Sequence, residues 1–103
     1  MRTFLVRGHS MEPHVSDGDL VFVRRLRSTP TVGDVVVYRQ RAPGFYVVHR
    51  VIGPSAGRWL MRGDRVDGVD PEPVSDRDIV GRVWCVLPRV GQLLAAFGAK
   101  RCG

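Results

Sequence analysis

Short runs of β-branched and aromatic residues alternate with Gly, Pro and Asp along most of the chain. Each run has the length and the residue types of a β-strand. The runs predict strands at 3–6, 20–25, 34–39, 45–52, 58–61 and 79–87. Segments such as "SDGD" at 16–19 and "RAPG" at 41–44 have the composition of turns. Closely spaced strands with hairpin-length turns predict an all-β fold, either a coiled, mostly antiparallel sheet or a partly closed barrel.

Several of these strands are apolar on both faces. In "FYVVHRVI" at 45–52, alternation places His49 on the same face as Phe45, Val47 and Val51. A histidine in such a position is usually a core residue bonded to a backbone carbonyl. Burial also favours the neutral imidazole, which can accept a proton.

The C-terminal segment is the one place where the pattern indicates a helix. "VGQLLAAFGAKRCG" at 90–103 places Leu93, Leu94 and Phe97 on one side of a short amphipathic helix. We therefore divide the chain into a β domain at 1–91 and a tail at 92–103. The tail is expected to pack on its own domain, with peripheral contact to a membrane as the alternative.

Composition limits the chain to one globular domain. It has 103 residues, 44% hydrophobic and 25% charged, which argues against disorder and against a coiled coil. The formal net charge of +6 would suit nucleic acid, an anionic membrane or an acidic polypeptide. The arginines are scattered and no aromatic residues lie between them at stacking intervals, so nucleic acid is not the expected partner.

No run approaches the roughly 20 apolar residues that a membrane span needs. On this ground a cytoplasmic or peripheral location is expected. Two cysteines, Cys85 and Cys102, are too few for a disulfide framework or a cysteine-based zinc site, and both are expected to be thiols. His9 and His14 could join His49 in a metal site, but no metal-binding spacing supports this, so no metal or cofactor is expected.

The stretch "RGHSMEP" at 7–13 raises the question of catalysis. Ser10 follows Gly8 in a short link between two strands, where a bend can lift its hydroxyl from the sheet. A serine needs a base, a group that orients the base and donors for the oxyanion. His49 is the candidate base. The loop "MRGDRVDGVDPEP" at 61–73 supplies four carboxylates, Asp64, Asp67, Asp70 and Glu72, although Asp and Gly are also common in plain turns.

Taken together, four segments resemble the conserved boxes of the signal peptidase I superfamily. "GHSMEP" resembles its Ser-Met-x-Pro nucleophile box, and "VGDVVVYR" resembles the strand that follows. "VVHRVIG" is similar to the box of the general base, which is histidine in the endoplasmic-reticulum and archaeal type. "RGDRVDGVD" resembles the Gly-Asp-Asn-Asn…Asp box, and the resemblance runs in order from about residue 4 to residue 91.

The resemblance implies a fold like that of the signal peptidase I and LexA catalytic domains. It also implies a serine endopeptidase that cleaves a leader or signal segment from a precursor polypeptide with small residues before the cut. Ser10 would be the nucleophile and His49 the base. Asp70 would orient His49 and Asp64 would support the loop, with those two roles interchangeable. Gly8, Met11 and Pro13 would contact the substrate, and the Ser10 backbone N–H would serve the oxyanion.

Two departures from the family pattern bear on these expectations. "GDRV" replaces Gly-Asp-Asn-Asn, and Gly8 lies where some relatives carry a hydroxyl. One rival interpretation is a LexA-like self-cleaving domain, but such domains use lysine as the base. Another is a small basic β-barrel that binds RNA or a protein without catalysis, with Ser10 and His49 both structural.

Overall fold

The computed structural model describes residues 1–41, 44–89 and 101–102. Its elements are seven strands and one 3-10 helix: β1 (Arg2–Leu5), β2 (Leu20–Arg24), β3 (Val35–Gln40), β4 (Phe45–Ser55), β5 (Arg58–Arg62), η1 (Asp76–Asp78), β6 (Ile79–Leu87) and β7 (Arg101–Cys102). The all-β prediction is confirmed. Six strands lie where the sequence places them, with ends that agree within one residue except at β4, which continues to Ser55.

The predicted C-terminal helix falls mainly on residues 90–100, which lie outside the described residues, as does the proposed boundary at residue 91. The two residues described near the C-terminus form β7 instead of a helix. This strand pairs antiparallel with β6 and sets Cys102 opposite Cys85. Within the part of the chain that the structure describes, no helix has the length and apolar character that a membrane crossing requires.

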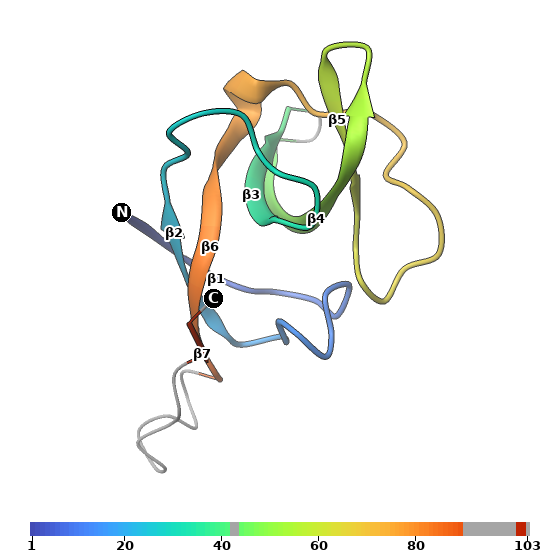
Figure 1. The fold of residues 1–103 in the computed structure, drawn as a ribbon. Helices are drawn as coiled ribbons and strands as arrows, with labels where there is room; N and C mark the ends of the chain where they lie inside the picture. The colour runs from blue at the N-terminus through green and yellow to red at the C-terminus, as the bar shows by residue number, and fades with distance from the viewer. Residues whose placement is uncertain (42–43, 90–100, 103) are drawn as a thin grey trace.

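All strands belong to one antiparallel sheet in the order β1-β2-β6-β3-β4-β5, with β7 added to β6 (Figure 1). β6, late in the chain, lies between β2 and β3 and joins the two halves of the sheet. Register shifts occur in the β2–β6, β3–β6 and β4–β5 pairs. Such irregularities bend strands and increase their twist. The described sheet is therefore coiled, while its edge strands β1 and β5 do not pair with each other.

The sheet has apolar clusters on both faces of its central strands. Val36 and Val37 are adjacent on β3 and both are fully buried, but they belong to different clusters. Val37 packs with Val86 of β6 and with a group from the first part of the chain: Val6, Met11, Val15, Val21 and Val23. Val36 packs with Tyr38, Val51, Met61 and Val74. The double-sided apolar pattern of the strand sequences thus reflects burial on both faces.

Candidate active site

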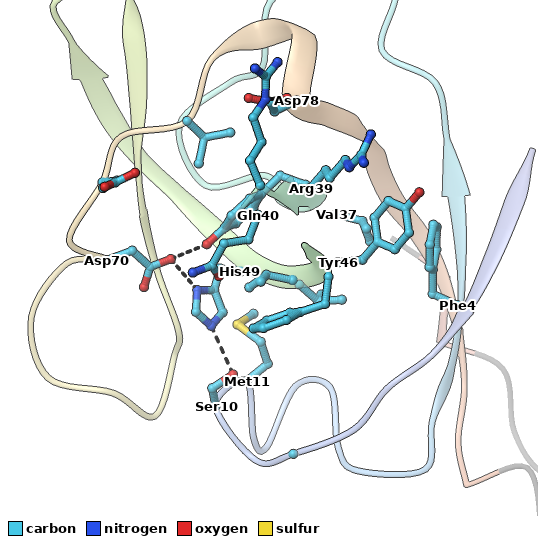
Figure 2. Close-up of a pocket in the computed structure, with 18 of the residues that line it drawn as sticks. Phe4, Ser10, Met11, Val37, Arg39, Gln40, Tyr46, His49, Asp70 and Asp78 are labelled. Carbon is cyan, nitrogen blue, oxygen red and sulfur yellow. Dashed lines mark hydrogen bonds and ion pairs between the residues drawn. The ribbon is translucent and has the colours of Figure 1, made fainter. Parts of the chain in front are cut away.

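Ser10, His49 and Asp70 meet in a line, although they come from three separate parts of the chain (Figure 2). The Ser10 Oγ lies 3.1 Å from the His49 Nε2, and the His49 Nδ1 lies 2.6 Å from the Asp70 Oδ2. His49 and Asp70 keep only 13% and 17% of their side-chain surfaces exposed. Ser10 is half-buried. The geometry has the order nucleophile, base and carboxylate that activates a serine.

The carboxylate fixes the tautomer of His49. An ionised Asp70 can only accept hydrogen bonds, so the hydrogen of a neutral imidazole lies on Nδ1 and points at Asp70. The lone pair of Nε2 then faces the Ser10 hydroxyl, which donates to it. This arrangement leaves His49 ready to take the Ser10 proton.

Tyr38 is a fourth member of this cluster that the sequence gave no reason to choose. Its hydroxyl donates to the Asp70 Oδ2 over 2.5 Å, so Asp70 accepts from Tyr38 and His49 through one oxygen. The Tyr38 ring is buried on β3 and meets the His49 ring edge-on, with centroids 6.3 Å apart. Burial, followed by the bond to Asp70, raises the pKa of the Tyr38 hydroxyl far above its ordinary range. The hydroxyl therefore remains a donor at any working pH.

The link between β1 and β2 presents Ser10 by anchoring the residues on both sides of it. Gly8 has a φ of 99°, a left-handed conformation that favours glycine, and its N–H donates to the Asp17 Oδ1 over 2.7 Å. Met11 is 2% exposed and packs in the core. The buried Asp19 accepts from the Ser16 and Arg89 N–H groups, which fixes the end of the link. The predicted turn at 16–19 thus helps to hold the segment that carries Ser10.

The turn after β5 contacts the segment that carries Ser10 from the other side. The Arg65 N–H donates to the Ser10 carbonyl over 2.8 Å, and the Asp64 N–H points at the Met11 Sδ over 3.4 Å. Gly63 packs so closely that an added Cβ would lie 2.8 Å from the Ser10 carbonyl oxygen and 3.1 Å from the His49 Nε2. Gly63 is thus a positioning residue that we did not select from the sequence. The one available signal was its place before Asp64 in the Gly-Asp box.

Asp64 lies in the site but not on His49. Its carboxylate accepts two hydrogen bonds from the Arg50 guanidinium, at 2.8 and 2.7 Å, and pairs with the His14 Nδ1 at 2.9 Å. Arg50 also donates to the Gly33 carbonyl. The hydrogen bonds from Arg50 are the largest cause that holds the pKa of Asp64 below its ordinary value of 3.8. The geometry therefore brings Asp70, and not Asp64, to His49.

The candidate metal ligands do not gather. His9 contacts Glu12 and His14 contacts Asp64, while His49 faces Ser10 and Asp70. Among the described residues, no group of three or more His, Cys, Asp or Glu side chains is arranged to hold a metal ion.

A cleft of about 1000 Å³ opens beside Ser10 and His49. One wall is Phe4–Gly8, which continues β1 toward Ser10. Residues 37–41 of β3 and the turn after it, residues 45–49 of β4, and residues 70–75, 77 and 78 line most of the rest. Of the three residues predicted to touch substrate, Gly8 and Met11 line this cleft, whereas Pro13 is exposed and does not. Figure 2 shows Phe4 and Tyr46 across the cleft from Asp70, and their rings are 5.0 Å apart.

The cleft also offers backbone groups for which the described residues supply no partner. Val6 points both of its backbone polar groups toward the neighbouring segment, since its N–H donates to the Asp19 carbonyl and its carbonyl accepts from the Gly18 N–H. In an extended chain, neighbouring residues point their polar groups to opposite sides. Leu5 and Arg7 therefore direct theirs away from β2, toward the cleft.

Comparison with known proteins agrees with this geometry. The sequence model of the Peptidase S24-like family matches residues 2–84. The chain is 34% identical over 100 aligned residues to the signal peptidase complex catalytic subunit SEC11 of Colletotrichum graminicola, which covers 84% of this chain and 58% of the relative. The corresponding subunits of Neurospora crassa and Clavispora lusitaniae are 33% and 34% identical, with 84% of this chain and 58% and 60% of the relative covered.

The chain thus spans about three fifths of the length of these curated relatives. The family match covers β1 to β5 and most of β6, which includes Ser10, His49, Asp64 and Asp70. Fold, site geometry and sequence similarity lead to one conclusion: the chain belongs to the Peptidase S24-like family.

Proposed function

We propose that the chain is a serine endopeptidase that cleaves a leader or signal segment from a precursor polypeptide. The observation that carries this proposal is the line from the Ser10 Oγ through His49 to the Asp70 carboxylate at the edge of a cleft. The relatives that are named signal peptidase catalytic subunits support the same reaction and the same class of substrate.

The proposed reaction is acyl transfer. The His49 Nε2 takes the proton from the Ser10 hydroxyl while the Oγ attacks the carbonyl carbon of the scissile peptide. Asp70 stabilises the resulting imidazolium through its Nδ1 hydrogen. The imidazolium then gives its proton to the leaving amine, the C–N bond breaks and an acyl ester forms on Ser10. Water, activated by His49, hydrolyses the ester and restores the hydroxyl.

An extended substrate fits the wall formed by Phe4–Gly8. The backbone groups of Leu5 and Arg7 that face the cleft can pair with a substrate strand, as in β-augmentation. Backbone pairing supplies affinity that does not depend on the substrate's side chains, so the side chains that line the cleft must provide the selectivity. Met11 follows Ser10, is buried and lines the cleft, and it is proposed to form part of the pocket floor for a small residue before the cut.

The experiment that tests this function uses a set of precursor-like peptides with Ala at the first and third positions before the cut. Ser10→Ala and His49→Ala are each expected to abolish cleavage while far-UV circular dichroism and thermal unfolding stay close to those of the parent protein. An acylating probe of the β-lactam type, followed by mass mapping, should place the adduct on Ser10. Undiminished turnover by Ser10→Ala would refute the assignment.

The same samples separate catalysis from the binding-module alternative. A basic β-barrel that binds RNA would give a salt-dependent mobility shift that Ser10→Ala leaves unchanged, together with no peptide cleavage. That pair of results would replace the proposed function with the alternative.

A further inference from the structure

The cleft carries more positive charge than its own carboxylates balance. The arginines that line it are Arg7, Arg39, Arg41, Arg58 and Arg77, and the acidic residues are Asp70, Glu72 and Asp78. Asp70 is bound by His49 and Tyr38, and Asp78 accepts a hydrogen bond from Arg41 over 3.0 Å. Among the described residues, four cleft arginines therefore lie outside any ion pair, and Glu72 is the one acidic residue of the cleft lining that is also outside any ion pair.

These four guanidinium groups are available to a ligand. Arg7, Arg39, Arg58 and Arg77 are all exposed. Outside the cleft, some arginines are paired, such as Arg50 with Asp64 and Arg65 with Glu12. Others, such as Arg27, are exposed and also lie outside any ion pair among the described residues. Tyr46, which also lines the cleft, has a lowered pKa mainly because of a hydrogen bond from Arg2, a residue outside the cleft lining, with a smaller contribution from the charge of Arg39.

The register of the sheet gives the distance of this charge from the reacting atoms. His49 lies opposite Val36 in the β3–β4 pair, and Tyr46 lies opposite Arg39. Arg39 is therefore three residue steps from His49, about 10 Å along the strands. The odd number of steps directs the two side chains to opposite faces of the β3–β4 pair, and both residues line the cleft. Arg41 lies two residues beyond Arg39 and binds Asp78, the neighbour of Arg77 in η1. Figure 2 accordingly shows Arg39 and Asp78 at the end of the cleft away from Ser10.

We propose that this end of the cleft binds acidic side chains of the precursor, three to five residues from the scissile bond, and that Arg39 and Arg77 are the residues that select them. This inference rests on the proposed peptidase function and adds a substrate class to it. An extended peptide advances about 3.3 Å per residue, so a carboxylate three to five positions from the cut reaches these guanidinium groups. Arginine suits the role because its planar donors match a carboxylate.

The test compares peptides that differ only in Glu or Gln at positions three to five from the cut, placed before it in one pair and after it in another. The parent protein is expected to cleave the Glu peptide of at least one pair with a kcat/KM about three- to tenfold higher, mainly through KM. This preference should decline as salt rises from 50 to 500 mM, since the contacts are exposed.

Three variants assign the preference to residues. Arg39→Gln and Arg77→Gln should each lower the Glu-to-Gln ratio by about two- to fivefold, while Glu72→Gln should raise it. Arg27→Gln is the matched control, because it removes the same charge from an exposed arginine outside the cleft. Both peptides are compared on one sample, so a partly unfolded variant does not distort the ratio.

The same question can be asked without turnover. Fluorescence anisotropy with Ser10→Ala protein measures the binding of a labelled Glu peptide and its Gln counterpart, and the Glu peptide should bind about three- to tenfold more tightly. A ratio of one for both peptide pairs and in this binding assay would overturn the inference. If Ser10-dependent cleavage persists in that case, the proposed peptidase function survives and only the substrate class is lost.

Discussion

Gly63→Ala tests how the turn after β5 holds Ser10, the proposed nucleophile. The new methyl carbon would lie 2.8 Å from the Ser10 carbonyl oxygen and 3.0 Å from the Ser10 Cβ, whereas ordinary contacts begin at 3.4 Å. The backbone of Ser10 must therefore move by about 0.6 Å, the difference between 3.4 and 2.8 Å. Gly63 does not need a left-handed φ, so the substitution is opposed by packing and not by backbone conformation.

Two effects of this displacement can be estimated. Overpacking a tight site costs about 1–3 kcal/mol of folding stability, which in a domain of this size lowers Tm by about 5–20 °C. Misplacing a reacting group by about 1 Å costs roughly 100-fold in rate, so a shift of this size should lower kcat/KM by about 10- to 100-fold. The methyl carbon also approaches the His49 Nε2 to 3.1 Å, where it interferes with the path of the proton.

The assays are peptide cleavage and thermal unfolding, measured at a temperature and pH where both proteins are fully folded. Gly53→Ala is the matched control, since Gly53 also lies outside the left-handed region and an added Cβ there meets nothing within 4 Å. It should leave the rate unchanged and the stability within about 0.5 kcal/mol. If Gly63→Ala matched Gly53→Ala in both kcat/KM and Tm, the close packing around Ser10 would have no energetic weight and the reasoning would be wrong.

Three further outcomes are expected. Asp70→Asn should lower kcat by about 10³- to 10⁴-fold, because His49 would be held in the wrong tautomer. Asp64→Asn should retain far more activity. Equal losses of kcat in steady-state assays would contradict the assignment of Asp70. Tyr38→Phe removes one donor from the Asp70 oxygen, so the less neutralised carboxylate should hold the imidazolium more strongly. We expect kcat to fall about tenfold and the acidic limb of the pH–rate profile to move to higher pH. A fall in kcat with no change in the position of that limb would indicate loosened packing only. Because hydrogen bonds from Arg50 hold the pKa of Asp64 below 3.8 in the folded state, that carboxylate stabilises the fold above about pH 4, and the stabilisation is lost as pH falls through the folded-state pKa. Thermal unfolding from pH 7 to 2.5 should therefore show a shallower loss of Tm in Asp64→Asn than in the parent protein, and parallel curves would count against the ion pair.

The sequence by itself determined the local structure and the candidate chemistry. Runs of Val, Ile and Phe bounded by Gly, Pro and Asp encode extended chain through nearest-neighbour preferences, so six strands could be predicted with ends close to those observed. Ser10 and His49 could be chosen because the box resemblance supplied a context that neither residue had alone. The all-β class followed from the same short-range information.

The tertiary structure decided which distant groups meet. The box resemblance favoured Asp70 over Asp64 as the partner of His49 but left the two roles interchangeable, because both are acidic residues of one turn-rich loop. Only the coiling of the sheet brings Asp70 to His49 and Arg50 to Asp64. Tyr38 looked like an ordinary aromatic residue of a strand until β3 was placed beside β4. Gly63 likewise gained its close contacts with Ser10 and His49 from the fold, and only the fold brings the cleft arginines to one surface. Strand propensity is a property of neighbouring residues, whereas a catalytic site depends on distances between segments that only the packed sheet defines.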